Sequence, residues 1–213
     1  FGHYTSFAGI EVQYISLWAS YGGKYHLLAH VPLAFATALA SSIVPAITTA
    51  VTAGLRTQAV DRIKTSIRFT MLVAIPSCVG LGVLAGPIVN LLFSGDGNDL
   101  AAVLLRIGCI TVVLYSFSTV TNAALQGINH MKAPAKNAAI ALAGHVLVMV
   151  ICLWGLDLGI YGVVIADIVF GLFMNILNLL SLSKYMRLRI DISKSFLLPA
   201  VASLVMGAAA WGV

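Results

Sequence analysis

The chain has 213 residues, of which 60% are hydrophobic and 9% are charged, and its mean hydropathy is +1.00. Soluble domains contain about 45–50% apolar and about 25% charged residues, so this composition excludes an ordinary soluble protein. It indicates an integral membrane protein. The net charge is +5. In a soluble protein such a charge would be compatible with nucleic-acid binding, but here the positions of the basic residues indicate membrane topology.

Apolar stretches recur along the whole chain. A helix that crosses a bilayer needs about 20 mainly apolar residues. Six stretches meet or approach this length: 27–55, 69–93, 100–127, 137–155, 159–182 and 195–213. The first and third are longer than needed, which predicts tilted or kinked helices. We therefore expect an all-α polytopic membrane bundle of about six transmembrane helices.

The basic residues alternate between connections. Ten of the twelve Lys and Arg residues fall in the loops predicted at 54–68, 128–137 and 183–194. In the loops at 94–99 and 156–158, the only charged residues are aspartates. Cytoplasmic loops of membrane proteins are enriched in Lys and Arg. We therefore place the three basic loops in the cytoplasm, beside anionic membrane lipids, and expect no nucleic-acid partner.

Three segments follow from this topology. Residues 1–26 are expected to be an extracytoplasmic interfacial segment, whose helix ends at Gly22-Gly23; the alternative is the tail of a preceding span. Residues 27–182 would form five transmembrane helices, and residues 183–213 a cytoplasmic loop and the start of a further one. Because the chain begins without Met and ends inside an apolar run, we expect a piece of a longer protein.

Small and polar residues form a stripe down the first span. They recur at helical intervals of three or four and include His30, Thr37, Ser41, Pro45 and Thr48. The stripe predicts one wall of a water-filled cavity. The alternative is close helix packing, because Ser, Thr and Ala are the usual small residues of helix contacts in membranes.

Other polar groups lie within or beside the predicted spans: Arg106, Asn122, Gln126, His145 and Asp167. Ionisable residues in hydrocarbon are costly and usually face the protein interior or a cavity. Arg106 is close enough to a span end to reach the headgroups. His145 is interpreted as a neutral side chain hydrogen-bonded between helices, and Asp167 either as a protonated, hydrogen-bonded group or as a carrier of a proton or cation.

No enzyme or metal motif appears. The sequence lacks GxSxG, HExxH, P-loop and GxGxxG patterns, and its three cysteines lie in apolar runs without a CxxC. We therefore expect a protein that is not an enzyme and that has no metal and no cofactor.

Four segments resemble a known family. They are VPLAFATALASSIVPAITTA (31–50), IRFTMLVAIPSCVGLGVLAGPIVNLLFSG (67–95), ALQGINHMKAPAKN (124–137) and GIYGVVIADIVFGLFMNILNLLSL (159–182). In this order they resemble the polysaccharide and lipid-linked oligosaccharide flippases, in particular the stage V sporulation protein B group of the multidrug/oligosaccharidyl-lipid/polysaccharide exporter superfamily. Gly144-His145 and Asp167 depart from the family pattern, which weakens any transfer of coupling-ion chemistry.

The resemblance implies a fold, the part of that fold that this chain would form, and a function. The chain would supply roughly helices eight to thirteen of a fourteen-helix protein with two lobes around a central cavity, and its N-terminal half would be the partner. The expected function is alternating-access translocation of an undecaprenyl-linked saccharide or cell-wall precursor across the bacterial cytoplasmic membrane. Alternatives are a cation-coupled multidrug antiporter of the same superfamily and a non-transporting membrane scaffold of cell-wall assembly. The cluster of Gln126, Asn129 and Asn137 is interpreted as a cytoplasmic gate contact.

Overall fold

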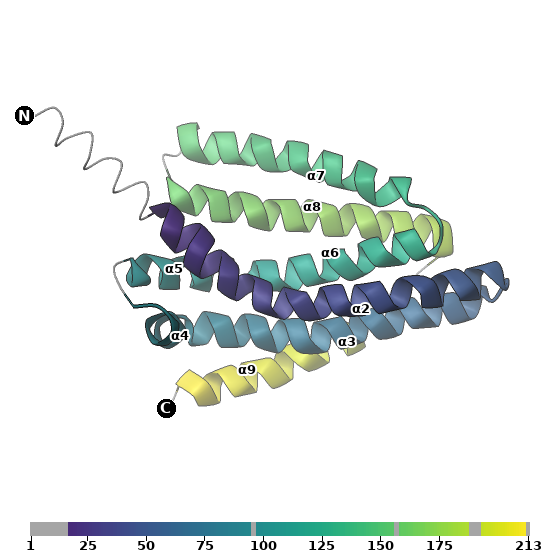
Figure 1. Ribbon diagram of the computed structural model, residues 1–213, viewed down its shortest axis with the longest axis horizontal. Helices are drawn as coiled ribbons and strands as arrows, with labels where there is room; N and C mark the ends of the chain where they lie inside the picture. Colours follow the sequence, from purple (N-terminus) through teal and green to yellow (C-terminus); the bar gives the residue numbers. More distant parts are fainter. Residues whose placement is uncertain (1–16, 95–96, 156–157, 188–192, 212–213) are drawn as a thin grey trace, which may run out of the picture.

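The computed structural model describes residues 17–94, 97–155, 158–187 and 193–211, and every regular element in these ranges is helical (Figure 1). The expected all-α class is confirmed. In chain order the elements are η1 (Ala19–Tyr25), α2 (His26–Thr52), α3 (Arg56–Val83), α4 (Ala85–Leu92), α5 (Asn98–Gly108), α6 (Ile110–Gly127), α7 (Lys132–Val150), η2 (Ile151–Gly155), α8 (Ile160–Met186), η3 (Ser193–Leu197) and α9 (Leu198–Trp211).

Among the described residues, four helical segments are long and apolar enough to cross a membrane: Ala19–Thr52, Arg56–Val83, Lys132–Gly155 and Ile160–Met186. The helices α5 and α6 form a fifth candidate span if they are taken together. Their axes meet at an angle of 51° at Cys109. The kink expected in the third apolar stretch is therefore confirmed. The sixth stretch is described only as a shorter apolar helix, Ser195–Ala210, so the described residues contain four or five candidate spans.

The N-terminal end of the first span differs from the prediction. Gly22-Gly23 does not end a helix, because η1 continues into α2 as one 34-residue segment. A glycine in a helix costs only about 1 kcal/mol relative to alanine. Tyr21 and Tyr25, on either side of the pair, are buried, which offsets that cost. The interfacial helix predicted before residue 17 lies outside the described residues.

The basic loops are shorter than expected. The chain turns at residues 53–55, where Gly54 has φ +74°, and α3 begins at Arg56, so most of the predicted 54–68 loop is helix. In the same way α7 begins at Lys132 and α8 continues to Met186. The reason is that Arg, Lys and Gln are good helix formers, so a fall in hydropathy does not mark a helix end.

The basic segments nevertheless share one end of the bundle. In Figure 1 the α2–α3 turn, the α6–α7 connection and the C-terminal end of α8 lie at the right, whereas α4, the start of α5 and the start of α8 lie at the left. This arrangement agrees with the alternation of charge along the sequence. We call the right-hand end the basic end.

Two buried clusters hold the helices together. One joins α2, α3 and α6 around Ile47, Ile63 and Leu125, and the other joins the start of α2 to α4 and α5 around Tyr25 and Leu104. The α2–α6 contact requires a glycine. A Cβ on Gly127 would lie 2.8 Å from Cβ of Ile47 and 3.2 Å from the carbonyl oxygen of Val44.

An asparagine network joins α6, α7 and α8. Buried Asn178 donates from Nδ2 to Oγ1 of Thr121 (3.0 Å) and to Oδ1 of Asn122 (2.9 Å). Its Oδ1 accepts from Nδ2 of Asn137 (2.9 Å), which also donates to Oγ of Ser181 (3.1 Å). Asn137 is therefore a buried helix-packing residue, and the gate contact stays a prediction.

Asn129, from the same predicted cluster, has a structural role as well. It follows α6 with φ +62° and its N–H donates to the carbonyl oxygen of Gln126 (2.9 Å). A left-handed residue directly after a helix is a common terminator, and Asn tolerates this conformation. Asn129 thus ends α6 at the basic end.

We expect Asn178→Leu to destabilise the intact protein by about 2 kcal/mol, because interhelical hydrogen bonds in membranes contribute about 0.6 and at most about 1.7 kcal/mol each and Asn178 makes three. Reversible denaturation in detergent measures the change. Ser181→Ala, which removes a single acceptor at the edge of the network, should cost less. Equal stability of Asn178→Leu and the unchanged protein would contradict the role of the network.

Candidate functional site

Two long helices, α2 and α6, enclose a polar pocket of about 350 Å³. We call it the α2–α6 pocket. It is lined by Thr37, Ala40, Ser41 and Val44 of α2 and by Thr119, Asn122, Ala123 and Gln126 of α6. Four of the side chains singled out in the sequence, Thr37, Ser41, Asn122 and Gln126, are therefore brought together. Within the described part of the chain, no Lys, Arg, Asp, Glu or His lines this pocket.

The hydrogen bonds within the helices decide what this pocket can offer a ligand. Thr37 donates from Oγ1 to the carbonyl oxygen of Ala34 (2.8 Å), and Ser41 donates from Oγ to that of Thr37 (2.9 Å). Their hydroxyl protons are thus used within α2, and the lone pairs remain as acceptors.

The amides on α6 complement these acceptors. Asn122 accepts from Asn178 at its Oδ1, so its NH₂ group is the part left as a donor. Gln126 is exposed and carries both a donor and an acceptor. The pocket therefore combines hydroxyl acceptors on one wall with amide donors on the other.

The predicted stripe on α2 is a free face within the described part of the chain. Its five candidates, His30, Thr37, Ser41, Pro45 and Thr48, are all exposed, whereas the opposite face of α2 is buried. Thr48 lies at the edge of the face, and its hydroxyl is within donating distance of the carbonyl oxygens of Val44 (2.9 Å) and Gly127 (3.1 Å). Pro45 and His30 lie outside the α2–α6 pocket. The stripe thus extends beyond this pocket and is accessible along α2.

Asp167 belongs to a separate cluster at the opposite end from the basic residues. Its Oδ2 accepts a hydrogen bond from the hydroxyl of Tyr21 (2.6 Å), and its carbonyl oxygen accepts one from Tyr115 (3.3 Å). In the same region His30 stacks on His26 with ring centroids 4.6 Å apart. The sequence did not single out Tyr21, because its partner is 146 residues away and aromatic residues near span ends are common.

Arg106 and His145 contribute to neither group. Arg106 is exposed in the last turn of α5, beside the bend. His145 is half-buried, its ring meets Phe170 edge-on at 6.0 Å, and its buried Nδ1 has no hydrogen-bond partner among the described residues. The interhelical hydrogen bond expected for His145 is therefore not made through Nδ1.

Within the described ranges, no group of three or more His, Cys, Asp or Glu side chains could hold a metal ion. Cys78, Cys109 and Cys152 are free thiols. Besides Tyr21, the sequence analysis did not identify Thr119, which lines the pocket, or Asn178, which lies behind it. Asn178 could have been identified from the sequence, because a polar amide within the apolar run 159–182 indicates a hydrogen bond to another helix.

We expect Tyr21→Phe to lower the stability of the intact protein by about 1–2 kcal/mol, because it removes a hydrogen bond to a carboxylate group. Tyr161→Phe on the exposed face of α8 is the matched control and should be neutral. A double-mutant cycle with Asp167→Asn in detergent denaturation measures the coupling between the two side chains. A coupling energy of zero would show that the contact contributes nothing.

These observations define a class: a multi-pass helical membrane protein with an accessible polar face on one of its longest helices. The profile of the family described as Lipid II flippase MurJ matches residues 24–212. The chain belongs to this family, whose members are multi-pass proteins of the bacterial cytoplasmic membrane. The expected superfamily is thereby confirmed.

Two curated relatives have matching descriptions. The chain is 26% identical over 166 residues to the probable lipid II flippase MurJ of Bdellovibrio bacteriovorus, covering 74% of this chain and 31% of the relative. It is 30% identical over 107 residues to the lipid II flippase MurJ of Bacillus subtilis, covering 49% of this chain and 20% of the relative. The chain thus spans less than a third of the length of either relative.

A solved structure has the same fold over most of this chain. It is described as lipid II flippase MurJ in an inward closed conformation, with a TM-score of 0.73 and 20% identity. The match covers 91% of this chain and 40% of the solved one. The described helices are therefore arranged as part of that larger fold.

Proposed function

We propose that the intact protein to which this chain belongs translocates a lipid-linked cell-wall precursor, lipid II, across the cytoplasmic membrane by alternating access. The family membership and the shared fold support this proposal. The observation that carries it is the convergence of the exposed α2 stripe with Asn122 and Gln126 in one polar pocket. The α2–α6 pocket would form part of the wall of the translocation cavity.

The chemistry of the pocket suits the saccharide part of such a substrate. Sugar hydroxyls and amides both donate and accept hydrogen bonds, which matches a wall of hydroxyl acceptors facing amide donors. Neutral groups also bind without the desolvation cost of buried charge. The pyrophosphate of such a substrate is anionic, but none of the described lining residues is charged. In this proposal the counter-charges come from other parts of the intact protein.

We infer that this chain forms part of the second lobe, because its four resembling segments occur in the order of the second half of that family. The chain accounts for 40% of the length of the solved structure. We infer that the N-terminal half of the same protein faces the exposed stripe of α2 and completes the cavity. The likeness to the stage V sporulation protein B group, and with it a role in sporulation, stays a prediction.

Cation coupling has one specific observation in its favour, the Tyr21–Asp167 hydrogen bond (2.6 Å) between the first and last long spans. A proton or cation at Asp167 would alter this contact and so the packing of α8 against the start of α2. The alternative of a cation-coupled multidrug antiporter has less support than the flippase, because the matching family is described as a lipid II flippase. A non-transporting scaffold would not need an accessible polar pocket.

We expect Ser41→Trp to reduce flipping of a fluorescent lipid-linked saccharide at least about tenfold, because the indole occupies the space of the saccharide and a loss of about 1.4 kcal/mol of binding in the transition state is a factor of ten. Purified intact protein in vesicles gives the rate. Ser42→Trp is the matched control: Ser42 is the next residue, is also exposed and also bonds back to its own helix, but does not line the pocket.

The two variants separate a blocked cavity from a general defect. Thermal unfolding in detergent should show both folded, since both residues are exposed on α2. If Ser41→Trp flips substrate at the rate of Ser42→Trp, the α2–α6 pocket is not part of the route. If both variants complement a flippase-deficient strain, the same conclusion follows in cells.

A further inference from the structure

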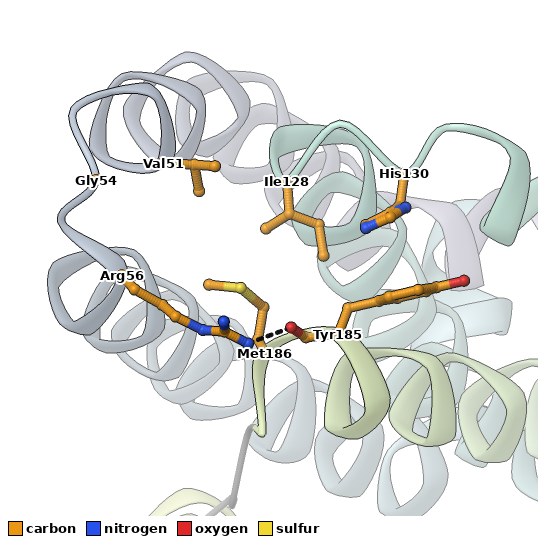
Figure 2. A pocket seen from close by; sticks show the side chains of 7 residues that line it. All are labelled: Val51, Gly54, Arg56, Ile128, His130, Tyr185 and Met186. Atoms are coloured by element: carbon orange, nitrogen blue, oxygen red, sulfur yellow. Dashed lines mark hydrogen bonds between the residues drawn. The ribbon is translucent and has the colours of Figure 1, made fainter.

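A second pocket lies at the basic end, away from the stripe on α2. Figure 2 shows its lining side chains, which come from three segments distant in sequence: the α2–α3 turn, the α6–α7 connection and the end of α8. We call it the basic-end pocket. Its volume is about 350 Å³, and it is lined by Val51, Gly54, Arg56, Ile128, His130, Tyr185 and Met186.

The guanidinium of Arg56 is held at one side of this pocket. One of its nitrogens donates to the carbonyl oxygen of Tyr185, as the dashed line in Figure 2 shows. An arginine has five N–H donors in a planar fork, so most of them remain for another acceptor. Among the described residues no carboxylate lines the pocket, so nothing in its described lining neutralises the positive charge of Arg56.

His130 supplies a second donor from the facing wall. Its ring stacks on the ring of Tyr185 with centroids 3.8 Å apart and planes at 16°. This contact fixes the orientation of the imidazole, which carries at least one N–H in either protonation state. Arg56 and His130 thus present donors from two separate segments to one cavity (Figure 2).

The surroundings add positive potential. Lys184 places Nζ 5.9 Å from the centre of the Tyr185 ring, and exposed Arg187 directly follows Met186. The helices α3 and α7 both start at the basic end (Figure 1), and their N-terminal turns carry further bases: Arg62, Lys64, Lys132 and Lys136. Among the described residues of this end, Asp61 is the single carboxylate. An anion is therefore attracted to this pocket, and a cation is repelled.

The rest of the lining is apolar. Val51 and Ile128 lie on one side of the cavity and Met186 on the other (Figure 2). A free inorganic anion has no apolar surface, so it would make no favourable contact with these three side chains. An anion attached to a short apolar segment would contact both parts of the lining, and such molecules are concentrated where a membrane protein meets the anionic leaflet.

We propose that the basic-end pocket binds the phosphate-ester headgroup of an anionic phospholipid of the cytoplasmic leaflet. Arg56 and His130 donate to the phosphate oxygens, because a guanidinium fork matches phosphate geometry. Val51, Ile128 and Met186 contact the glycerol and the first methylenes. A bound headgroup ties the α2–α3 turn, the α6–α7 connection and the end of α8 together. The proposal does not depend on transport.

The test is binding of phosphatidylglycerol to the intact natural chain that contains residues 1–213, purified in detergent. Native mass spectrometry counts the bound lipid, thermal unfolding reports the stabilisation, and phosphatidylcholine is the neutral reference. Glycerol phosphate is titrated in parallel as a soluble phosphate ester without acyl chains. The variants are Arg56→Gln, His130→Phe, which keeps the stacked ring but removes the N–H donors, and Arg62→Gln as the matched control on the same helix.

We expect Arg56→Gln to weaken phosphatidylglycerol binding about tenfold, the usual scale for one charge-assisted hydrogen bond, and His130→Phe to weaken it by a smaller factor. Arg62→Gln should change it less than about twofold, as a screened surface charge does. If glycerol phosphate binds the unchanged protein as tightly as phosphatidylglycerol does, the apolar lining contributes nothing, and the occupant is a soluble phosphate ester instead of a lipid. Equal effects of Arg56→Gln and Arg62→Gln, or none from either, overturn the proposal.

Discussion

The close contact between α2 and α6 determines where both pockets lie. Ile47 packs onto Gly127, and Thr48 donates to the carbonyl oxygen of Gly127 from the same turn of α2. On one side of this contact lies the α2–α6 pocket, whose lining includes Val44 and Gln126. On the other side lie Val51 and Ile128 of the basic-end pocket. A side chain at position 127 would separate the helices and alter both cavities.

The environment of the bundle explains how its polar side chains are used. In hydrocarbon an unsatisfied polar group is costly, so hydroxyls bond back to their own helix and amides pair across helices. Thr37 and Ser41 follow the first pattern, and Asn137 and Asn178 follow the second. These bonds leave acceptors on α2 and donors on α6, and the polarity of the pocket is a consequence of bonds made outside it.

Much of this architecture could be predicted from hydropathy and charge, because the bilayer imposes both on the sequence. The apolar runs located the spans, and the spacing of Thr37 and Ser41 placed them on one face. The helix ends could not be predicted in the same way. Arg56 and Lys132 begin helices although they lie in basic segments, since charged residues propagate a helix as well as apolar ones do.

The partners of the polar residues were also beyond prediction. Asn122 and Asn178 are 56 residues apart, and Tyr21 and Asp167 are 146 apart, so nothing local in the sequence connects them. From the sequence, Asn137 was placed in the basic loop at 128–137. In the structure it lies in the buried asparagine network, where it donates to Asn178. Such pairs form because the helices are packed in a particular register, and register depends on the shapes of many side chains at once.

The sequence by itself determined that this is a membrane protein of several spans, which end of the bundle carries its positive charge, and the family of flippases that it resembles. These properties follow from residue type and order alone. Only the tertiary structure decided that α2 and α6 share one polar pocket, that Asp167 meets Tyr21, and that Arg56 and His130 meet at Tyr185. The physical reason is that these contacts exist only once the helices have packed, and packing joins residues that the chain keeps far apart.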